Sequence, residues 1–294
     1  VLLNGTVTSR RGFVVVFIVR LRFTRGQRYD IHLSKWHTST FFGHSCSQKI
    51  FGPLYRLIQV TVFLQKEHDM SVCIKSLIRN LNLVVGCSVG CAYCYARNNC
   101  RRFHMTDDFA VPEYMPRKLR IMDRRDPRVF LMTGMSDLSD WWPEWLAEVF
   151  DRMARNPQHA YLYLTKRPER LDLQTDDDNV WMGVTVTCEA EKGRIAALRQ
   201  HARARHYHVT FEPLFGPIEG LDLRGVEWIV VGTETGHRRG KVDARPEWVA
   251  GIVAQARAQG VAVFMKEDLL PILGEEGMIQ ELPEAFKQKI WNRN

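Results

Sequence analysis

Three cysteines, Cys87, Cys91 and Cys94, lie in one short segment of the chain with the spacing C-x3-C-x2-C. Three thiols at this spacing can all bind one compact inorganic site, and thiolates are soft ligands that suit iron–sulfur clusters or zinc. A cubane cluster with only three protein sulfur ligands has one iron open to another molecule. The spacing is therefore typical of a cluster that has one iron open to another molecule.

Two other uses of the cysteines stay open at this point. Seven cysteines in 294 residues is an odd and sparse number for a secreted protein held together by disulfides. A structural zinc site normally has four ligands, and the nearest further candidates are Cys73, Cys100 and His104. Because Cys100 lies among polar and basic residues at 97–102, we expect a helix or loop there and a free Cys100 thiol.

The composition is that of a soluble globular protein and excludes a disordered chain, with 45% hydrophobic and 25% charged residues. The net charge of +8 is unevenly distributed, because +7 of it falls on residues 1–70. The remaining chain is almost neutral. The basic balance is therefore only a weak indication of nucleic-acid binding.

The amino-terminal region differs from the rest of the chain. Its apolar segment at 12–19 is too short to span a bilayer, is followed by Arg20 and Arg22, and has no small-residue cleavage site after it. We interpret it as a β-strand of an added hairpin, and we expect a cytoplasmic protein with no membrane partner. A further interpretation is that residues 1–69 are upstream sequence translated from an incorrect start site, with Met70 as the natural start.

From about residue 79, short β-branched runs alternate with helical patterns, which predicts βα units and a parallel α/β sheet. The candidate strands are Leu81–Val85, Val129–Met132, Tyr161–Thr165, Val180–Val186, Tyr207–Phe211, Trp228–Val231 and Val261–Met265. The candidate helices are Pro143–Arg155, Glu189–His201 and Pro246–Gln259. This pattern suits a partial barrel or an open doubly wound sheet.

Each candidate strand is followed by polar or unusual residues. These are the cysteines, Thr133–Asp137, Thr165–Pro168, Thr185–Glu189, Glu212-Pro213, Gly232–Gly236 and Lys266–Asp268. The carboxyl ends of parallel strands meet at one face of a barrel, where the working residues of such folds lie. We therefore expect these segments to form one site with the cysteines.

The cysteine run, with Tyr93 before its third cysteine, resembles the radical SAM superfamily. Other segments are similar to phage- and mobile-element-associated radical SAM proteins of the mobile pair type, and to spore photoproduct lyase-like proteins. These segments are Gly134–Leu138, Leu164–Arg170, Asn179–Val186, Phe211–Ile218 and Trp228–Gly232. The resemblance implies a partial (β/α)6 TIM-type barrel over 79–274, with an atypical N-terminal extension at 1–78 and a C-terminal tail at 275–294.

The resemblance also implies cofactors and site residues. Cys87, Cys91 and Cys94 would hold a 4Fe-4S cluster, with S-adenosyl-L-methionine (SAM) on its open iron. The expected cofactor contacts are Tyr93, Gly134, Ser136, Asp137, Lys166, Thr185, Glu212, Thr233 and Glu234. The more common Gly-Gly-Glu pattern is absent at Gly134. Glu212 has an alternative role, as a buried ion-pair partner of Lys166 or Lys266.

The implied activity is reductive cleavage of SAM to a 5′-deoxyadenosyl radical that acts on an unidentified substrate, in a lyase or modification reaction supported by an external electron donor. Cys188 is the candidate hydrogen donor to a substrate radical, or else a small apolar residue at a helix start. Nucleic acid is a candidate substrate, because basic residues gather between Arg97 and Arg128, although a solvated basic face explains them equally well. A competing hypothesis belongs to a different functional class. In it the chain is an Fe–S or zinc module without catalysis that binds a companion radical SAM protein.

Overall fold

The computed structural model describes residues 2–8, 14–22, 30–33 and 72–291. The chain divides into two compact units, Val1–Leu64 and Gln65–Asn294. In the first unit, β1 (Leu2–Thr8), β2 (Val14–Arg22) and β3 (Asp30–Leu33) form an antiparallel sheet in the order β1-β2-β3. The segment predicted to be a hairpin strand thus contributes to β2. Met70, the candidate start residue, lies outside the described residues.

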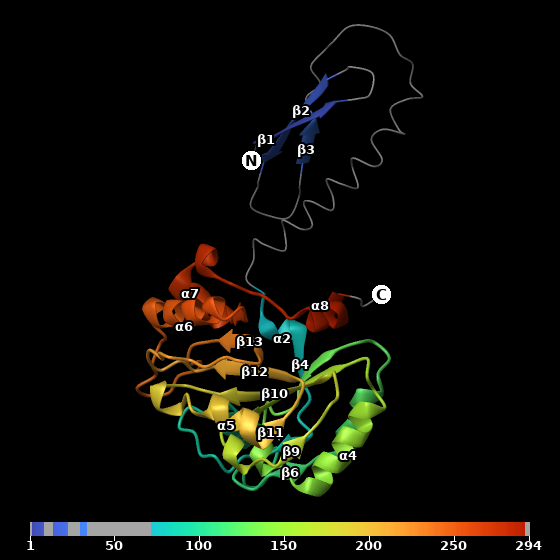
Figure 1. Cartoon of the computed structure of the whole chain (residues 1–294), viewed down its shortest axis with the longest axis vertical. Coiled ribbons are helices and arrows are strands. Elements are labelled where there is room, and N and C mark those ends of the chain that lie inside the picture. The colour runs from blue at the N-terminus through green and yellow to red at the C-terminus, as the bar shows by residue number, and fades with distance from the viewer. Residues whose placement is uncertain (1, 9–13, 23–29, 34–71, 292–294) are drawn as a thin grey trace. The chain divides into compact units, whose positions relative to one another are not determined.

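The second unit is built on a sheet of seven strands, all parallel, in the order β14-β13-β12-β10-β8-β7-β4 (Figure 1). The sheet curls into a half-barrel, so the predicted partial TIM-type barrel is confirmed. Its strands are β4 (Ile78–Asn80), β7 (Val129–Leu131), β8 (Ala160–Thr165), β10 (Val180–Thr185), β12 (His206–Phe211), β13 (Val226–Val231) and β14 (Ala262–Met265).

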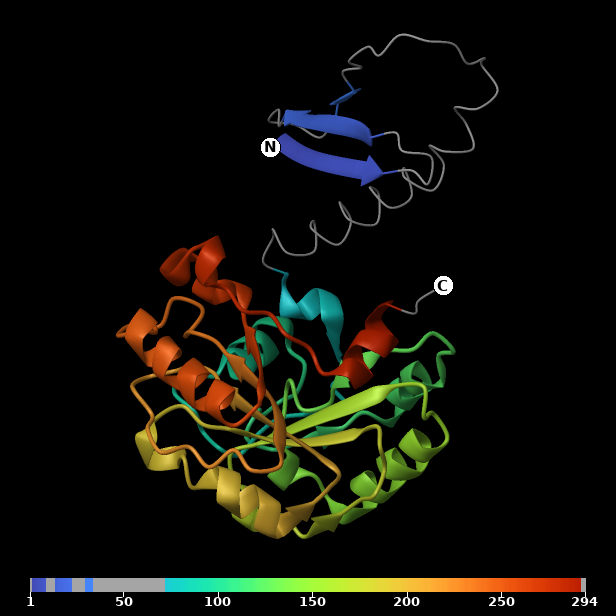
Figure 2. The ribbon, with the colours of Figure 1, turned by 45° about the horizontal axis from the view of Figure 1, so that its top comes forward.

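Helices cover both sides of the curled sheet (Figure 2). On its outer side lie α4 (Pro143–Ala154), α5 (Arg194–His201) and α6 (Pro246–Ala258). On its open side lie α2 (Ile74–Leu77) and α8 (Glu284–Trp291). Helices α4 and α6 each begin with a proline, whose fixed φ and missing N–H are tolerated at a first helical position.

Shorter elements connect these parts. The helices are α3 (Tyr95–Phe103), α7 (Leu270–Leu273) and the 3-10 turns η1 (Pro116–Asp123), η2 (Leu138–Asp140), η3 (Pro168–Arg170), η4 (Glu189–Glu191), η5 (Glu267–Leu269) and η6 (Glu275–Gly277). Two small sheets pair β5 (Val84–Val85) with β6 (Glu113–Tyr114), and β9 (Leu173–Gln174) with β11 (Ala202–Arg203).

The first strand differs from the sequence prediction, whereas the other six candidate strands match within two residues. Ile78–Asn80 rather than Leu81–Val85 pairs with β7. Val84–Val85 instead pairs antiparallel with β6, outside the barrel. The two apolar runs are adjacent, and hydrophobicity alone does not say which of them enters the sheet. Strand β5 lies immediately before the cysteine segment and β6 follows α3, so this pair joins the two ends of the excursion that carries the cysteines.

Side chains of each strand alternate between the two faces of the sheet, as the period of a β-strand requires. On β13, Ile229 and Val231 pack in the core under the outer helices, whereas Trp228 and Val230 point into the barrel. Inside, Trp228 contacts Phe286 of α8 edge to face, at 5.4 Å between ring centroids. Helix α8 thereby fills the interior near the amino ends of the strands and leaves the opposite end open. Within the described residues, no helix is long and apolar enough to cross a bilayer.

Candidate active site

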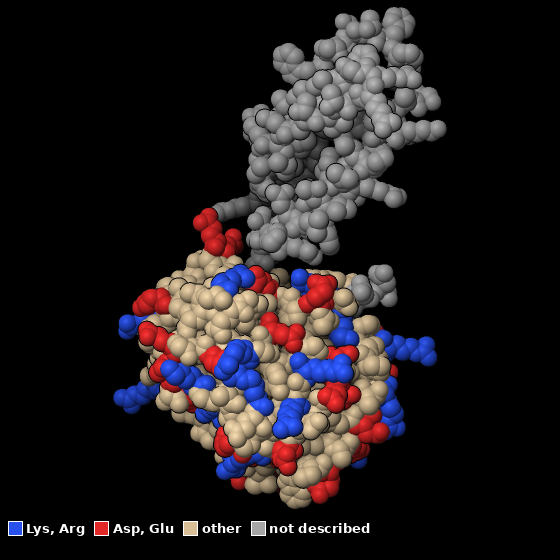
Figure 3. All heavy atoms as spheres, in the orientation of Figure 1, with Lys and Arg blue, Asp and Glu red and all other residues tan. Residues whose placement is uncertain are grey.

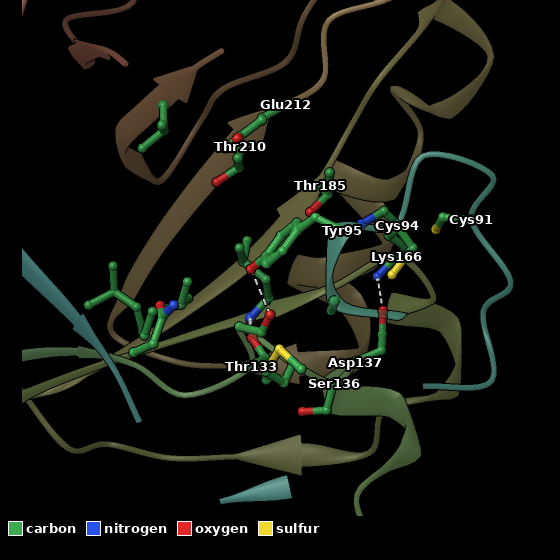
Figure 4. Close-up of a pocket in the computed structure, with 18 of the residues that line it drawn as sticks. Cys91, Cys94, Tyr95, Thr133, Ser136, Asp137, Lys166, Thr185, Thr210 and Glu212 are labelled. Atoms are coloured by element: carbon green, nitrogen blue, oxygen red, sulfur yellow. Dashed lines mark hydrogen bonds between the residues drawn. The ribbon is translucent and has the colours of Figure 1, made fainter. Parts of the chain in front are cut away.

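A cavity of about 360 Å³ opens at the carboxyl ends of the parallel strands. Apolar residues of the strands form its deep part, among them Leu131, Leu162, Trp228 and Val230. Polar residues surround its mouth, and Figure 4 shows several of them pointing toward the same space from different strands. An enclosed apolar volume with a few convergent polar groups is the usual form of a small-molecule site.

The cavity brings together ten of the residues predicted from the sequence. They are Cys87, Cys91, Tyr93, Cys94, Gly134, Ser136, Asp137, Lys166, Thr185 and Glu212. Four of them belong to the cysteine loop, and the other six come from the ends of β7, β8, β10 and β12, so the strand-end rule explains why these six meet here.

The cysteine segment is fixed at its start by Gly86. This residue has φ +115°, and a Cβ there would lie 2.7 Å from the Val111 carbonyl oxygen, so only glycine fits. Its N–H donates to the Met135 carbonyl at 3.0 Å. Farther along, the Ser88 N–H and hydroxyl donate to the Asp140 carboxylate at 2.8 and 2.7 Å. The segment is thus attached to the loop after β7.

The three cysteines are free thiols of intermediate exposure. Burial, with the nearby Asp137 and Asp140 carboxylates, raises the pKa of Cys87 to about 12. Metal binding at Cys87 must therefore displace a proton from a neutral thiol. In the described part of the chain, no three His, Cys, Asp or Glu side chains are already arranged to hold a metal ion.

Asp137 connects the ends of two neighbouring strands. Its carboxylate is buried and accepts hydrogen bonds from the Ser139 N–H and hydroxyl, the Thr165 hydroxyl and the Lys166 N–H, at 2.6–3.0 Å. Beside it, the Ser136 hydroxyl accepts from the Trp141 indole at 2.9 Å. These bonds position the loops of β7 and β8 around the cavity.

The backbone of Gly134 and two tyrosines form the side of the cavity next to the cysteines. The Tyr95 hydroxyl donates to the Gly134 carbonyl at 2.7 Å. Tyr93 packs its ring edge on Phe215, at 5.1 Å between centroids. The ammonium of Lys166 lies 5.8 Å from the Tyr93 ring centroid, within cation–π range. Lys166 therefore faces the cysteine side of the cavity.

On the opposite side of the mouth, Lys266 forms ion pairs with Glu212 and with Asp268. Burial lowers the pKa of Lys266, but the two carboxylates outweigh it and the pKa is raised. Burial and the Glu212 charge raise the pKa of Asp268. The sequence left open an ion pair of Glu212 with Lys166 or with Lys266, and the structure contains the pair with Lys266. This group has two carboxylates, Glu212 and Asp268, and one ammonium, Lys266, and all three line the cavity.

Three predicted site residues do not line the cavity. Glu234 is buried and pairs with Arg238 at 2.6 Å, and the Thr233 hydroxyl accepts from the Ala244 N–H at 2.8 Å. Both residues hold the loop after β13 in place. Cys188 is half-buried just after β10 and does not border the cavity.

Other cavity residues were not among the expected cofactor contacts. They include Asn80, Tyr95, His208, Thr210, Lys266 and Asp268. His208 and Thr210 of β12 lie four and two residues before Glu212. Because side chains two residues apart share one face of a strand, the position of Glu212 predicts that both face the cavity. Lys266 and Asp268 directly follow β14, and the strand-end rule marks them as well.

The fold and the site define an α/β partial barrel with a thiol-rich cavity at the carboxyl ends of its strands. Residues 74–269 match the model of a family described as "Protein of unknown function (DUF5131)". The chain belongs to this family. A comparison with curated proteins gave no match. Among solved structures, a mutant of spore photoproduct lyase with dinucleoside spore photoproduct aligns with a TM-score of 0.43 and 12% identity, over 64% of this chain and 76% of that chain.

Proposed function

We propose that this protein is a radical SAM enzyme that reductively cleaves S-adenosylmethionine and abstracts a hydrogen atom from a second substrate. The observation that carries the proposal is that the three cysteines of the C-x3-C-x2-C segment border the same cavity as the polar strand ends of a partial barrel. Such a cavity has room for a small organic molecule beside the thiols.

The donor set fits a 4Fe-4S cluster. Cys87, Cys91 and Cys94 are free and belong to one loop, and no fourth cysteine lines the cavity among the described residues. Gly86 and Gly90 both have positive φ, at +115° and +81°, which allows the loop to turn sharply around a ligand. The three thiols of this loop would each bind a different iron of the cluster.

When bound, the cluster and SAM would supply the one-electron cleavage that gives methionine and a 5′-deoxyadenosyl radical. The residues of the chain would bind and orient SAM and would exclude water from the site. Tyr93 and Lys166 lie next to the cysteine loop, where they can contact an adenine ring or a carboxylate. Thr185 is positioned as a donor for a ribose hydroxyl. Glu212 and Asp268 can accept hydrogen bonds from donor groups on the far side of the cavity.

The decisive experiment uses the full chain, purified without oxygen, reconstituted with iron and sulfide and reduced with dithionite. We expect 5′-deoxyadenosine from SAM, and we expect Cys91→Ala to reduce its rate at least a hundredfold, because two thiolates do not retain a cubane cluster. Cys188→Ala, which changes a cysteine outside the cavity, is the matched control for SAM cleavage.

Product is quantified by chromatography, and iron and sulfide are measured in the same samples. Equal product from wild type and Cys91→Ala would refute the proposal. A wild-type protein that keeps four iron atoms per chain without forming 5′-deoxyadenosine would favour an iron–sulfur module without catalysis. Zinc in place of iron after anaerobic purification would favour the zinc alternative.

A further inference from the structure

Helix α3 (Tyr95–Phe103) begins directly after the third cysteine of the site. Cys94 is its N-cap, and the Cys94 sulfur accepts a hydrogen bond from the Arg97 N–H at 3.4 Å. Ala96 and Cys100 face inward and are buried. With a rise of 1.5 Å per residue, the far end of this helix lies about 10–15 Å from the cysteine loop. Its outer face is therefore surface close to the proposed cluster.

This outer face is basic. Helix α3 contains Arg97, Arg101 and Arg102 and no acidic residue. Arg101 and Arg102 are exposed, and in the described part of the chain none of the three arginines pairs with a carboxylate. Phe103 is 63% exposed, and the Arg102 guanidinium lies 5.3 Å from its ring centroid.

The arginines of the other long helices are arranged differently. Their side chains form ion pairs with carboxylates. This is true of Arg152 of α4, Arg194 and Arg199 of α5, and Arg257 of α6. On the face of the barrel in Figure 3, basic and acidic side chains are intermixed. The arginines of α3 have no carboxylate partner among the described residues, so the solvent-facing part of this helix is positive and ends in an exposed phenylalanine. We call Arg97, Arg101, Arg102 and Phe103 the α3 patch.

We propose that the α3 patch is the docking surface for a small acidic one-electron carrier protein that reduces the cluster. This inference rests on the proposed function. In the step it supports, the carrier's flavin or iron–sulfur centre is oxidised by one electron, and the 4Fe-4S cluster is reduced from the 2+ to the 1+ state. Electron transfer weakens steeply with distance, so such a carrier must dock close to the cluster, and α3 begins at the third cysteine.

The dimensions of the patch favour a protein over a nucleic acid. Exposed Asp107 and Asp108 follow the helix within a few residues and interrupt the run of basic residues in the sequence there. A nucleic acid requires a longer row of cations along its phosphates. Redox encounters between proteins are small, and charge complementarity mainly raises their association rate.

The test reverses the charges at the two exposed positions, in Arg101→Glu/Arg102→Glu. The matched control is Arg125→Glu/Arg203→Glu, which makes the same charge change at two exposed arginines that have no carboxylate partner among the described residues. They lie before β7 and β12 and thus toward the amino ends of the strands. Binding of oxidised, acidic flavodoxin is measured by calorimetry at low salt. Cluster reduction by flavodoxin hydroquinone is followed by stopped-flow absorbance.

We expect Arg101→Glu/Arg102→Glu to weaken flavodoxin binding and slow cluster reduction by flavodoxin at least tenfold, with a flatter salt dependence. The control is expected to change both less than twofold. Reduction by dithionite, and SAM cleavage driven by it, should be the same in all three proteins. Because acidic residues at a helix C-terminus can destabilise it, Arg101→Gln/Arg102→Gln is measured too and should show about half the loss on a logarithmic scale.

Equal flavodoxin binding by wild type and both α3 variants would overturn the docking proposal. So would variants that lose binding of a single-stranded oligonucleotide but keep flavodoxin-dependent reduction, since the patch would then serve nucleic acid. Failure of the proposed function has a different signature, because wild type would make no 5′-deoxyadenosine with dithionite. Flavodoxin binding measured by calorimetry still tests the patch in that case.

Discussion

At the scale of single residues, Asp137 shows how one buried carboxylate supports the site. Its Oδ1 accepts from the Ser139 N–H, the Ser139 hydroxyl and the Thr165 hydroxyl, and its Oδ2 accepts from the Lys166 N–H. An ionised carboxylate only accepts, so all four donors are satisfied by one side chain. The sequence placed Asp137 at a strand end, but its partners on β8 could not be predicted, because strand adjacency is a property of the folded sheet.

We predict that Asp137→Asn lowers the free energy of unfolding by about 2–3 kcal/mol, since hydrogen bonds to charged groups contribute most. The new amide N–H₂ must face at least one of the donors that now point at the carboxylate. For a domain of this size the loss corresponds to a fall in Tm of about 5–10 °C, measured by circular dichroism. Asp107→Asn, at an exposed carboxylate with no partner among the described residues, is the control. A Tm within 2 °C of wild type for Asp137→Asn would contradict this role.

At the scale of elements, neighbouring strands β10 and β12 fit together through a glycine. His208 of β12 lies opposite Gly183 of β10, and its Nε2 lies 3.0 Å from the Tyr163 carbonyl of β8. A Cβ at Gly183 would lie only 2.6 Å from the His208 Cδ2. The ring is buried from solvent and borders the cavity, and its bond to the Tyr163 carbonyl holds it against Gly183.

We predict that Gly183→Ala costs about 1–3 kcal/mol of stability through this overlap, measured by urea unfolding. In the His208→Ala background, the same substitution should cost less than 1 kcal/mol, so that the double-mutant cycle shows coupling. Gly251→Ala in α6 is the opposite case, because a Cβ there contacts nothing within 4 Å. It should stabilise the protein by about 0.5–1 kcal/mol. Equal effects of Gly183→Ala with and without His208 would exclude the overlap as the cause.

The same strands show what the sequence can and cannot predict at this scale. Continuous apolar runs such as Val180–Thr185 of β10 have the length and β-branched content of buried parallel strands, so their existence and bounds follow from pattern. The run at Leu81–Val85 has equal hydrophobicity and yet contributes only its end to β5. Which run pairs with β7 depends on contacts with distant segments such as β6, and these leave no local pattern.

At the scale of the whole molecule, the strand-end rule predicted most of the cavity. It works because every parallel strand delivers its carboxyl end to one face. It does not say which side chains then point inward, and so Thr233 and Glu234 were grouped with residues that line the cavity. Glu234 instead pairs with Arg238 four residues later, a contact that a local charge pattern also allows. The sequence pattern therefore predicts where the mouth of the cavity lies. Whether a charged residue such as Glu234 lines the cavity depends on the ion pairs that it forms with its neighbours.

The acid stability of the molecule depends in part on His208. Burial lowers its pKa to about 4, from an ordinary value of about 6.5, although its bond to the Tyr163 carbonyl opposes this. The folded state therefore favours neutral His208, and the unfolded state binds the extra proton between pH 6.5 and 4. Stability contributed by this group is complete above pH 6.5 and is lost as the pH falls toward 4.

Between pH 7 and pH 5, this linkage removes about 2 kcal/mol from the free energy of unfolding. We predict that His208→Gln, which keeps an N–H donor for the Tyr163 carbonyl but cannot titrate, reduces the pH dependence by that amount. The quantity to compare is the difference in urea unfolding free energy between the two pH values. His237→Gln, at an exposed histidine, should leave this difference unchanged. If His208→Gln and wild type lost the same stability over this interval, His208 would not be the group that makes the barrel acid-sensitive.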